Sequence, residues 1–448
     1  MGGAFVAPPT LAHHQASQPP TPPMRRIIIS FLATFAVALP VFVLMTRGGS
    51  PPSDRPTAAL PPAAPANAPT DVRIRTLQAT VRAAPQRADG WTLLAGAYLQ
   101  KVRETGDAGF YVRAQGAVDR ALQLRPGDPG ALTQRSALEL SRHDFRAGLA
   151  DAERARAQAP QVAQPFGALV DGLVELGRYD EAGRALQTMV DRKPDLAAYS
   201  RVSYFRELHG DLPGALSAMR AAVSAGGAVP EQDAYVRSLL GGLELQRGDV
   251  AAARRSYHGA LASVPGYPAA EAGLAQADVA RGRLAPAIAR LQRVVERLPL
   301  SSSIVALGEA QAAAGRSGDA KQSFALVRAE TQLQQRAGVN ADVELALFEA
   351  DHGSPQRAVD LARKAWAAAP SIRSADALGW ALHGAGHSRA ALAWARRALA
   401  LGSRDPAFNL HAALIARAAG KPEQARAWMA VARSGRAALT AQLREQVR

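Results

Sequence analysis

The sequence contains no cysteine, which excludes disulfide bonds, thiolate metal sites and haem attached through cysteine. Lysine is scarce too, so the formal charge of +15 comes almost entirely from arginines scattered along the chain. They form no basic run with interleaved aromatic residues, and nucleic-acid binding is therefore not expected. The hydrophobic fraction of 48% is ample for a core, and 448 residues are too many for one compact domain unless the fold is elongated.

Catalytic motifs are also missing from the sequence. It has no phosphate-binding loop of the form G-x-x-x-x-G-K-[ST], no H-E-x-x-H and no G-x-S-x-G. The adjacent residues His13 and His14 lie in a proline-rich tail and are weak candidates for metal ligands. We therefore expect no catalytic, cofactor or metal site, and we expect that the protein is not an enzyme.

One long uncharged stretch is present near the N-terminus. Residues 27–46 carry no charge, and as a helix they would span about 30 Å, the thickness of the hydrocarbon core of a bilayer. They predict an uncleaved transmembrane signal anchor behind a disordered tail (1–26), with cleavage further downstream and a start at Met24 as alternatives. The positive charges at its two ends are nearly balanced, and we expect the bulk of the chain on the extracytoplasmic side of the cell membrane. Residues 47–70 are rich in proline and alanine and predict a semi-rigid spacer.

The most informative pattern in the chain is periodic. Glycines recur at intervals of 33 to 38 residues, and each is followed by an alanine five positions later. These glycines are Gly177, Gly210, Gly248, Gly282, Gly315, Gly353, Gly386 and Gly420. A period near 34 predicts a stack of helix–turn–helix units that bury their core between neighbours.

Residues 163–194 resemble a tetratricopeptide repeat position by position. The family's aromatic, apolar, turn-glycine, tyrosine, small, large-apolar and terminal-proline positions are held by Phe166, Leu169, Leu173, Gly177, Tyr179, Ala182, Leu186 and Pro194. Ala182 must be small because two helices cross there, Gly177 ends the first helix in a left-handed conformation, and Pro194 ends the second. The resemblance covers about residues 88–433 and implies an all-α superhelix of about ten repeats. With an N-terminal cap, the predicted array spans residues 71–433.

Departures from the repeat pattern predict local irregularities. The first unit inserts residues 102–108 between its helices, which predicts a loop, and the second has His143 in place of the turn glycine. Extra length near residues 226–230 and 331–338 predicts a change of pitch or a protruding loop. Residues 434–448 predict a polar helix that caps the last repeat.

The resemblance also implies a binding groove. In tetratricopeptide-repeat proteins the first helices of successive units line a concave groove that takes peptides or protein segments. Transferring the inward positions by repeat phase gives the candidates Tyr204, Glu207, Tyr235, Asn340, Arg373, Asp376, Trp380 and His383. Trp380, with Arg373 and Asp376 beside it, is the strongest candidate for an aromatic anchor, and Tyr204 is the second. The alternative is that these are ordinary inner-face residues without a ligand.

Three functions fit these features. The leading hypothesis is a membrane-anchored scaffold that binds a peptide or protein segment in the groove. An envelope chaperone or assembly factor for secreted or membrane clients is the alternative, and it would bind unfolded clients instead of one folded partner. A binder of anionic cell-wall polymer is a lesser alternative, whose affinity would fall steeply with ionic strength. The sequence identifies neither the partner nor the oligomeric state.

Overall fold

The computed structural model describes residues 68–226 and 229–447. These residues form 22 α-helices and one short 3-10 helix, η1. The prediction of an all-α fold is confirmed for this part of the chain. The predicted anchor (27–46) and the tail before it lie outside the described residues, as does nearly all of the predicted spacer. None of the described helices combines the length and the apolar character needed to cross a membrane.

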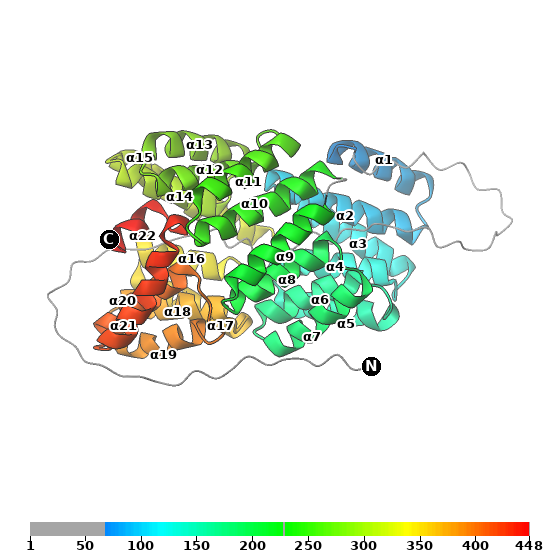
Figure 1. The fold of residues 1–448 in the computed structure, drawn as a ribbon. Coiled ribbons are helices and arrows are strands. Elements are labelled where there is room, and N and C mark those ends of the chain that lie inside the picture. The colour runs from blue at the N-terminus through cyan, green and yellow to red at the C-terminus, as the bar shows by residue number, and fades with distance from the viewer. Residues whose placement is uncertain (1–67, 227–228, 448) are drawn as a thin grey trace.

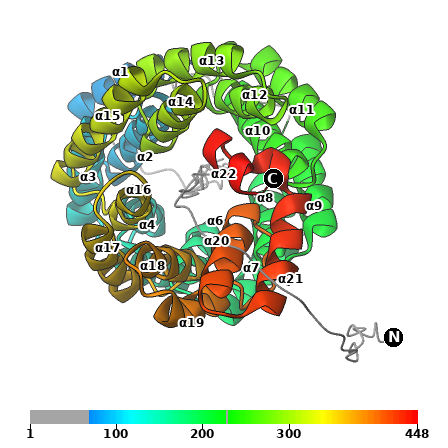
Figure 2. The same cartoon turned by 90° about the vertical axis from the view of Figure 1, so that its left-hand side faces the viewer.

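After α1 (Thr70–Ala83), the helices alternate between an inner and an outer layer of a superhelix (Figures 1 and 2). The first helix of each repeat faces the central lumen: α2 (Ala88–Thr105), α4 (Pro129–Ser141), α6 (Gln164–Glu175), α8 (Leu196–Leu208), α10 (Pro230–Gln246), α12 (Pro268–Ala280), α14 (Ser301–Ala313), α16 (Asp342–His352), α18 (Ile372–Gly384) and α20 (Pro406–Ala418). The second helix lies outside: α3 (Gly109–Leu124), α5 (Phe145–Gln158), α7 (Tyr179–Arg192), α9 (Leu212–Ala225), α11 (Val250–Ser263), α13 (Leu284–Arg297), α15 (Ser317–Arg336), α17 (Pro355–Ala368), α19 (Ser388–Ala398) and α21 (Pro422–Ser434). The structure therefore contains ten helix pairs, as the repeat pattern predicts.

The glycine and alanine positions explain this architecture locally. The alanine five residues after the turn glycine is buried in each of the last eight repeats, where a larger side chain would separate the two helices: Ala182, Ala215, Ala253, Ala287, Ala320, Ala358, Ala391 and Ala425. Seven of the eight turn glycines take a positive φ, which costs glycine little. His143 takes the same left-handed conformation in the second repeat, with φ of 61°. Gly353 is the exception, with φ of −142°.

Consecutive turns of the superhelix contact each other through the tight turns that join the two helices of the early repeats. The Nδ1 atom of His143 lies 2.6 Å from the carbonyl oxygen of Asn340, which is 197 residues away along the chain. A Cβ atom placed on Gly177 would overlap the carbonyl oxygen of Pro370. Turn glycines of the first superhelical turn are thus needed both for their backbone conformation and for close approach to the second turn.

Gly210 repeats this arrangement one unit later. A Cβ atom there would overlap the carbonyl oxygen of Gly402, in the linker before α20. By contrast, no other atom of the described chain lies within 4 Å of the corresponding Cβ position at Gly282, Gly315 or Gly386. A turn glycine therefore lies in close contact with other backbone atoms only where it faces the next turn of the superhelix.

The loop predicted at residues 102–108 and the protruding-loop alternative at residues 331–338 are both wrong. Residues 102–108 do not form a long loop, because α2 continues to Thr105 and the N–H of Gly106 bonds the carbonyl oxygen of Val102 at 2.7 Å. The extra residues near 331–338 do not protrude as a loop either, because α15 absorbs most of them as one 20-residue helix. Residues 227 and 228, within the other insertion, lie outside the described part of the chain.

The last segment differs in form and polarity from the polar capping helix predicted over 434–448, although its Leu439, Leu443 and Val447 pack into the core of α18 to α21. After α21 the chain turns inward and forms η1 (Arg436–Ala438) and α22 (Ala441–Gln446) within the lumen (Figure 2). Leu439 and Leu443 are completely buried there, so the segment is apolar on its packed side. We call residues 435–447 the lumenal segment.

Candidate functional site

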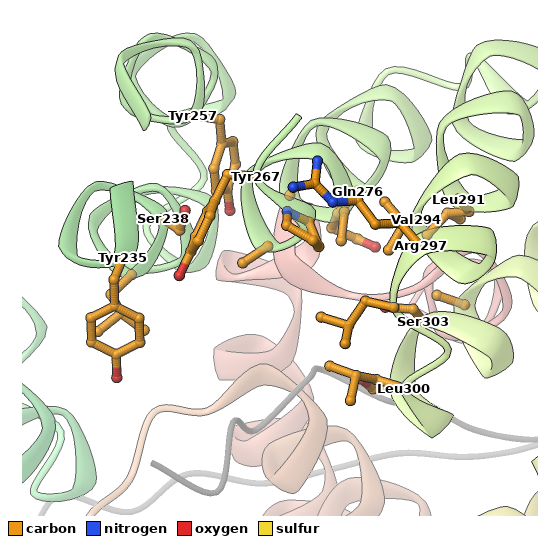
Figure 3. Close-up of a pocket in the computed structure, with 18 of the residues that line it drawn as sticks. Tyr235, Ser238, Tyr257, Tyr267, Gln276, Leu291, Val294, Arg297, Leu300 and Ser303 are labelled. Carbon is orange, nitrogen blue, oxygen red and sulfur yellow. The ribbon is translucent and has the colours of Figure 1, made fainter. Parts of the chain in front are cut away.

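A cavity of about 360 Å³ lies among helices α10 to α14, beside the lumenal segment (Figure 3). Large aliphatic side chains from both helix layers line it, namely Leu239, Leu245, Val279, Leu291, Val294 and Leu300. Thr440 and Ala441 of the lumenal segment form part of its wall. The volume and the apolar lining suit a ligand group the size of a few amino-acid side chains.

The cavity exists because small residues line α12 on this side. Ala269, Ala272 and Gly273 contribute almost no side chain to the space between α10 and α14. The ring of Tyr257, from the outer helix α11, reaches inward and would overlap a Cβ atom at Gly273 or at Gly241. The two glycines therefore admit an aromatic wall that any larger residue would push away.

One end of the cavity is polar. Arg103 and Glu104, at the end of α2, face Glu231 at the start of α10. Burial lowers the pKa of Arg103, although Glu231 acts in the opposite sense, and burial raises the pKa of Glu231. Burial also raises the pKa of Tyr235 and of Tyr267, which keeps both hydroxyl groups protonated. Hydrogen-bonding groups therefore border an apolar chamber, and such an arrangement orients a ligand.

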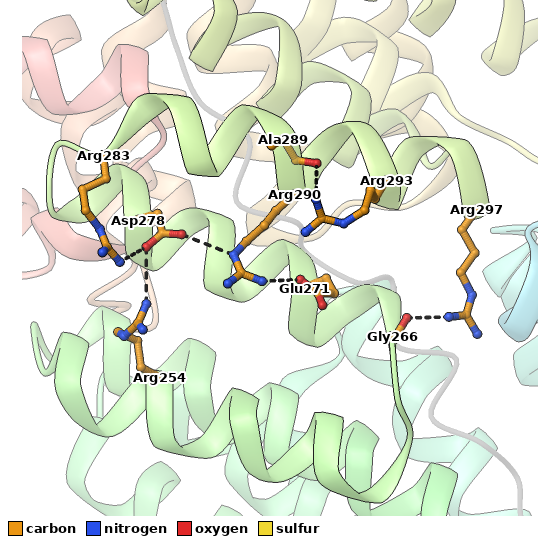
Figure 4. Close-up of polar contacts among 9 residues, drawn as sticks. All are labelled: Arg254, Gly266, Glu271, Asp278, Arg283, Ala289, Arg290, Arg293 and Arg297. Carbon is orange, nitrogen blue, oxygen red and sulfur yellow. Dashed lines mark hydrogen bonds and ion pairs between the residues drawn. The ribbon is translucent and has the colours of Figure 1, made fainter.

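A charged cluster holds α12 in position behind this chamber (Figure 4). The buried carboxylate of Asp278 is approached by Arg254 of α11 at 3.3 Å, by Arg290 of α13 at 3.3 Å and by Arg283 from the intervening turn. Arg290 also pairs with Glu271 at 2.6 Å. Ion pairs around the Asp278 carboxylate therefore hold α11, α12 and α13 together, and they keep the wall of the cavity in place.

Of the eight residues predicted for the groove, Tyr235 alone lines this cavity. Four others, Asn340, Arg373, Glu207 and Tyr204, lie where the two superhelical turns meet. Arg373 pairs with Glu344 at 3.2 Å and with Glu175 at 4.0 Å, and so joins α18 to α16 and to α6 of the preceding turn.

Burial acts to raise the pKa of both Glu175 and Glu344. The pKa of Glu175 is raised, because burial outweighs the nearby positive charge. At Glu344 the effect of burial is outweighed by His143 and Arg373, which hold its pKa below the usual value. Tyr204 lies in the same electrostatic neighbourhood, and burial raises its pKa. Asn340 donates its backbone N–H to the carbonyl oxygen of Arg142 at 2.8 Å. These residues join the two turns to each other.

Glu207 occupies a related position between α8 and the chain before α20. Burial raises its pKa to about 8, and the nearby carboxylate of Asp405 adds to the shift, while a hydrogen bond with Gln246 opposes it. The carboxyl group is therefore largely protonated at neutral pH, so Glu207 carries little charge for a ligand to recognise.

Asp376, Trp380 and His383 lie in the second turn, within a network of buried polar groups. The indole N–H of Trp380 donates to Asp351 at 3.0 Å, and its ring stacks on His411 with centroids 4.4 Å apart. The Nδ1 atom of His411 lies 2.9 Å from both carboxylate oxygens of Asp376. Burial lowers the pKa of His383 to about 4. Trp380, the strongest sequence candidate, is only 4% exposed and already has partners.

Aromatic and charged residues at the inward positions, which point to the groove, do not point to this cavity. The available signal was the opposite one, a run of small residues at the inward positions of α12, namely Ala269, Ala272 and Gly273. Within the residues that the structure describes, no three His, Asp or Glu side chains are arranged to hold a metal ion.

Comparison with known proteins identifies the repeats. Residues 244–307, which run from the end of α10 into α14, match the tetratricopeptide repeat family. This part of the chain includes α11, α12 and α13, whose arrangement recurs through the ten helix pairs. Residues 244–307 are thus similar to tetratricopeptide repeats, and the other helix pairs share their inner and outer arrangement. A comparison with curated proteins found no significant sequence match.

Solved structures with related helical arrays resemble the chain only distantly. The APC/C hetero-tetramer Cut9–Hcn1 is 12% identical, with 82% of this chain and 90% of that chain covered and a TM-score of 0.37. Human IFIT1, solved as a dimer with PPP-AAAA, is 13% identical, with 81% and 86% covered and a TM-score of 0.45. The type IV pilus biogenesis factor PilW is 18% identical, with 46% and 97% covered and a TM-score of 0.38. At these values the likeness does not extend to function.

Proposed function

We propose that this chain is a tetratricopeptide-repeat protein that acts as a non-catalytic scaffold and binds an apolar segment of a partner protein at the cavity among α10 to α14. The single observation that carries the proposal is the cavity of about 360 Å³, with aliphatic walls and a polar end. A peptide presents the same combination, because its side chains can fill an apolar chamber while its backbone needs hydrogen-bonding partners.

The polar end supports a polypeptide ligand in particular. Arg103, Glu104 and Glu231 offer both donors and acceptors at this end of the cavity, and the tyrosine hydroxyl groups add further ones. Tyrosine and arginine are the residue types that contribute most to protein interfaces, since they combine contact area with directional hydrogen bonds. One or two large apolar side chains, such as those of leucine or phenylalanine, suit the volume and the lining of the cavity.

Anchoring in a membrane through residues 27–46 is part of the proposal and rests on the sequence of that stretch alone. In this arrangement the array is held outside the cytoplasm. The test is a Ser434→Cys variant treated in intact cells with a membrane-impermeant maleimide, because Ser434 is exposed and the chain has no other cysteine. Labelling of intact cells supports the extracytoplasmic location, and labelling that requires lysis overturns it.

The binding proposal is tested by selecting ligands from a random peptide library on the purified protein. We expect peptides with one or two large apolar residues to be enriched. We expect these peptides not to bind an Ala272→Trp variant, because the indole fills the cavity. Ala329→Trp is the matched control, because Ala329 is exposed on the outer helix α15.

Two results would contradict this proposal. Selected peptides that bind the Ala272→Trp variant as well as the wild type would place the site elsewhere. Binding of unfolded proteins without enrichment of any peptide would favour the chaperone alternative, in which clients are recognised without sequence preference.

A further inference from the structure

The outer helices of the last three repeats carry an excess of positive charge. α17 has three basic residues and one acidic residue, α19 has three basic residues and no acidic one, and α21 has two basic residues and one acidic one. The outer helices α5 and α7 differ, because α5 has three basic and two acidic residues and α7 has two basic and three acidic ones. The positive charge of the chain is therefore unevenly distributed over its outer layer.

Side-chain contacts join α17, α19 and α21 into one continuous surface, along which the three helices follow one another (Figures 1 and 2). The rings of Trp366 on α17 and Trp394 on α19 meet edge to face, with centroids 4.9 Å apart. Arg396 of α19 donates to the side-chain oxygen of Gln424 of α21 at 2.8 Å. We call the outward side of these helices the basic face, whose exposed cations include Arg363, Lys364, Arg389, Arg396, Arg397 and Arg426.

Most of these charges are not neutralised by the part of the chain that the structure describes. The acidic residues on the three helices are Asp360, which pairs with Arg363 at 3.9 Å, and Glu423, which pairs with Arg426. Lys364 and the arginines of α19 form no ion pair with any described residue. These exposed cations are therefore available to an external anion.

Two tryptophans hold Arg397 in place on this face. Its guanidinium group lies 4.6 Å from the ring centroid of Trp394 and 5.8 Å from that of Trp366. A planar guanidinium that rests on an aromatic ring keeps N–H groups at its edge, where they match the two oxygens of a phosphate group. Because the side chain is already ordered, less conformational entropy is lost when such an anion binds.

The tryptophans of the basic face also have free indole N–H groups. Among the five tryptophans of the chain, Trp91 and Trp380 each donate the N–H to an acceptor within the chain at 3.0 Å. Trp366, Trp394 and Trp428 donate to no residue that the structure describes, and their indole nitrogens are not buried. Their rings nevertheless pack against the apolar core. An indole with an apolar side in the core and a polar edge at the surface is typical of residues at a bilayer interface.

A bilayer with anionic headgroups is the occupant that these observations favour. A protein partner usually takes large apolar side chains into its pockets, but within the described residues none is exposed on α17, α19 or α21, where alanines lie between the charges. A nucleic acid requires open aromatic faces for base stacking, whereas Trp366, Trp394 and Arg397 cover one another. An anionic bilayer requires neither feature, since it attracts basic side chains and accepts indole groups among its headgroups.

We propose that the basic face docks the array on a membrane surface that contains anionic lipids. Lys364 and the arginines lie against the lipid phosphates, and the indole N–H groups donate to headgroup oxygens. The helices that line the cavity take no part in this contact, so the cavity remains accessible to a partner. This inference goes beyond the proposed function. An anchor at residues 27–46 would hold the face near a bilayer, and docking does not require it.

The test uses the full chain reconstituted in lipid vesicles whose headgroups carry a nitroxide quencher. Because the chain has no cysteine, a fluorophore is attached to Ala393→Cys on α19 or, as the matched control, to Gln187→Cys on α7, both of which are exposed. In vesicles of phosphatidylcholine with about one quarter phosphatidylglycerol, we expect the label at residue 393 to be quenched and the label at residue 187 not to be. In phosphatidylcholine alone, or in about 1 M salt, we expect the two labels to be alike.

Charge removal provides a second measurement on the label at residue 393. The three arginines of α19 are replaced together: Arg389→Gln, Arg396→Gln and Arg397→Gln. We expect quenching to fall about fivefold or more, because each basic side chain near an anionic surface contributes to the attraction. The control removes three exposed arginines from α5 and α7 and is expected to leave quenching unchanged: Arg154→Gln, Arg156→Gln and Arg184→Gln. Circular dichroism checks the fold of both variants, and the lipid and salt comparisons need neither of them.

Four results would overturn the inference. Equal quenching of the two labels in anionic vesicles means that the chain has no preferred face towards the bilayer. No quenching at residue 393 means that the basic face stays away from it, whether or not an anchor holds the chain. Quenching that persists in the α19 variant means that the basic charge is not responsible. A label at residue 393 that responds to soluble polyphosphate and not to anionic vesicles reassigns the face to a soluble polyanion.

The two proposals fail separately. The library peptides are expected at the cavity among α10 to α14, which lies on other helices than the basic face. Absence of peptide binding therefore leaves the vesicle measurements unaffected, and absence of quenching leaves the peptide selection unaffected.

Discussion

The hydroxyl oxygen of Tyr179 accepts a hydrogen bond from the backbone N–H of Ile372 at 2.9 Å, although 193 residues separate them along the chain. Tyr179 begins the outer helix of the third repeat, and Ile372 begins the inner helix of the ninth. The repeat tyrosine thus satisfies a free N–H at the start of a helix in the next superhelical turn. Tyr179, which the repeat pattern predicts, therefore also joins two turns of the superhelix.

Gly177→Ala is expected to destabilise the protein more than Gly315→Ala. Both glycines have positive φ, 71° and 78°, so each substitution incurs about 1–2 kcal/mol of backbone strain. At Gly177 the new methyl group also overlaps the carbonyl oxygen of Pro370, which adds about 1–3 kcal/mol. Urea unfolding followed by circular dichroism measures both. Equal decreases in the free energy of unfolding would show that Gly177 and Pro370 are not in close contact.

Arg373→Met is expected to lower the free energy of unfolding by about 3–5 kcal/mol, because Glu175 and Glu344 lose their buried cationic partner. Arg363→Met is the control, since Arg363 pairs with Asp360 on the surface and its loss changes stability by less than about 1 kcal/mol. Adding Glu175→Gln and Glu344→Gln to Arg373→Met restores most of the loss if charge burial is the cause. No rescue would instead assign the effect to packing.

Glu207→Gln is expected to change how stability depends on pH. The pKa of Glu207 is raised from 4.5 to about 8, so the folded state holds this proton more tightly than the unfolded state. The contribution of Glu207 is complete below pH 4.5 and is lost as pH rises through 8.

The free energy of unfolding of the variant is therefore expected to rise relative to that of the wild type as pH increases across this range, by on the order of 5 kcal/mol. A difference between the two proteins that stays constant with pH would mean that Glu207 is ionised in the folded state. Glu423→Gln is the control, because Glu423 is exposed at the start of α21.

Trp380→Phe is expected to cost about 1–3 kcal/mol beyond the loss of ring area, because Asp351 loses the indole N–H that it accepts at 3.0 Å. Burial already raises the pKa of Asp351, and removing this donor raises it further. Trp428→Phe, on the outer helix α21, is the control and is expected to cost less, since Trp428 is only partly buried. If Trp380→Phe instead left stability unchanged and weakened a selected peptide, the original assignment of Trp380 to the groove would regain support.

The repeat architecture was predictable because each unit is specified by short-range features. A turn glycine, a small residue at the helix crossing and a terminal proline act within about 34 residues, so the period, the helix pairs and the buried alanines follow from the sequence. His143 fits the same logic, since the second repeat still requires a left-handed residue at its turn.

The contacts between turns were not predictable in this way. They depend on the superhelical pitch, which is the sum of small rotations over many repeats, and an error of a few degrees in each would move Pro370 away from Gly177. For the same reason, Arg373 could be assigned to an inner face but not to its partner Glu175. The cavity escaped prediction because it is made by side chains that are small, and the lumenal segment because its partners lie in distant repeats.

The touching turns also limit how such a protein can change in length. An open solenoid tolerates the duplication or deletion of a whole unit, because each unit contacts only its neighbours. Here one unit added between the third and ninth repeats would bring Gly177 opposite the linker of another repeat in place of Pro370. The particular pairs that join the turns, such as Tyr179 with Ile372, would be exchanged for others. A change in the number of repeats therefore requires matching changes in the residues between turns, and this array is expected to gain or lose units less freely than an open one.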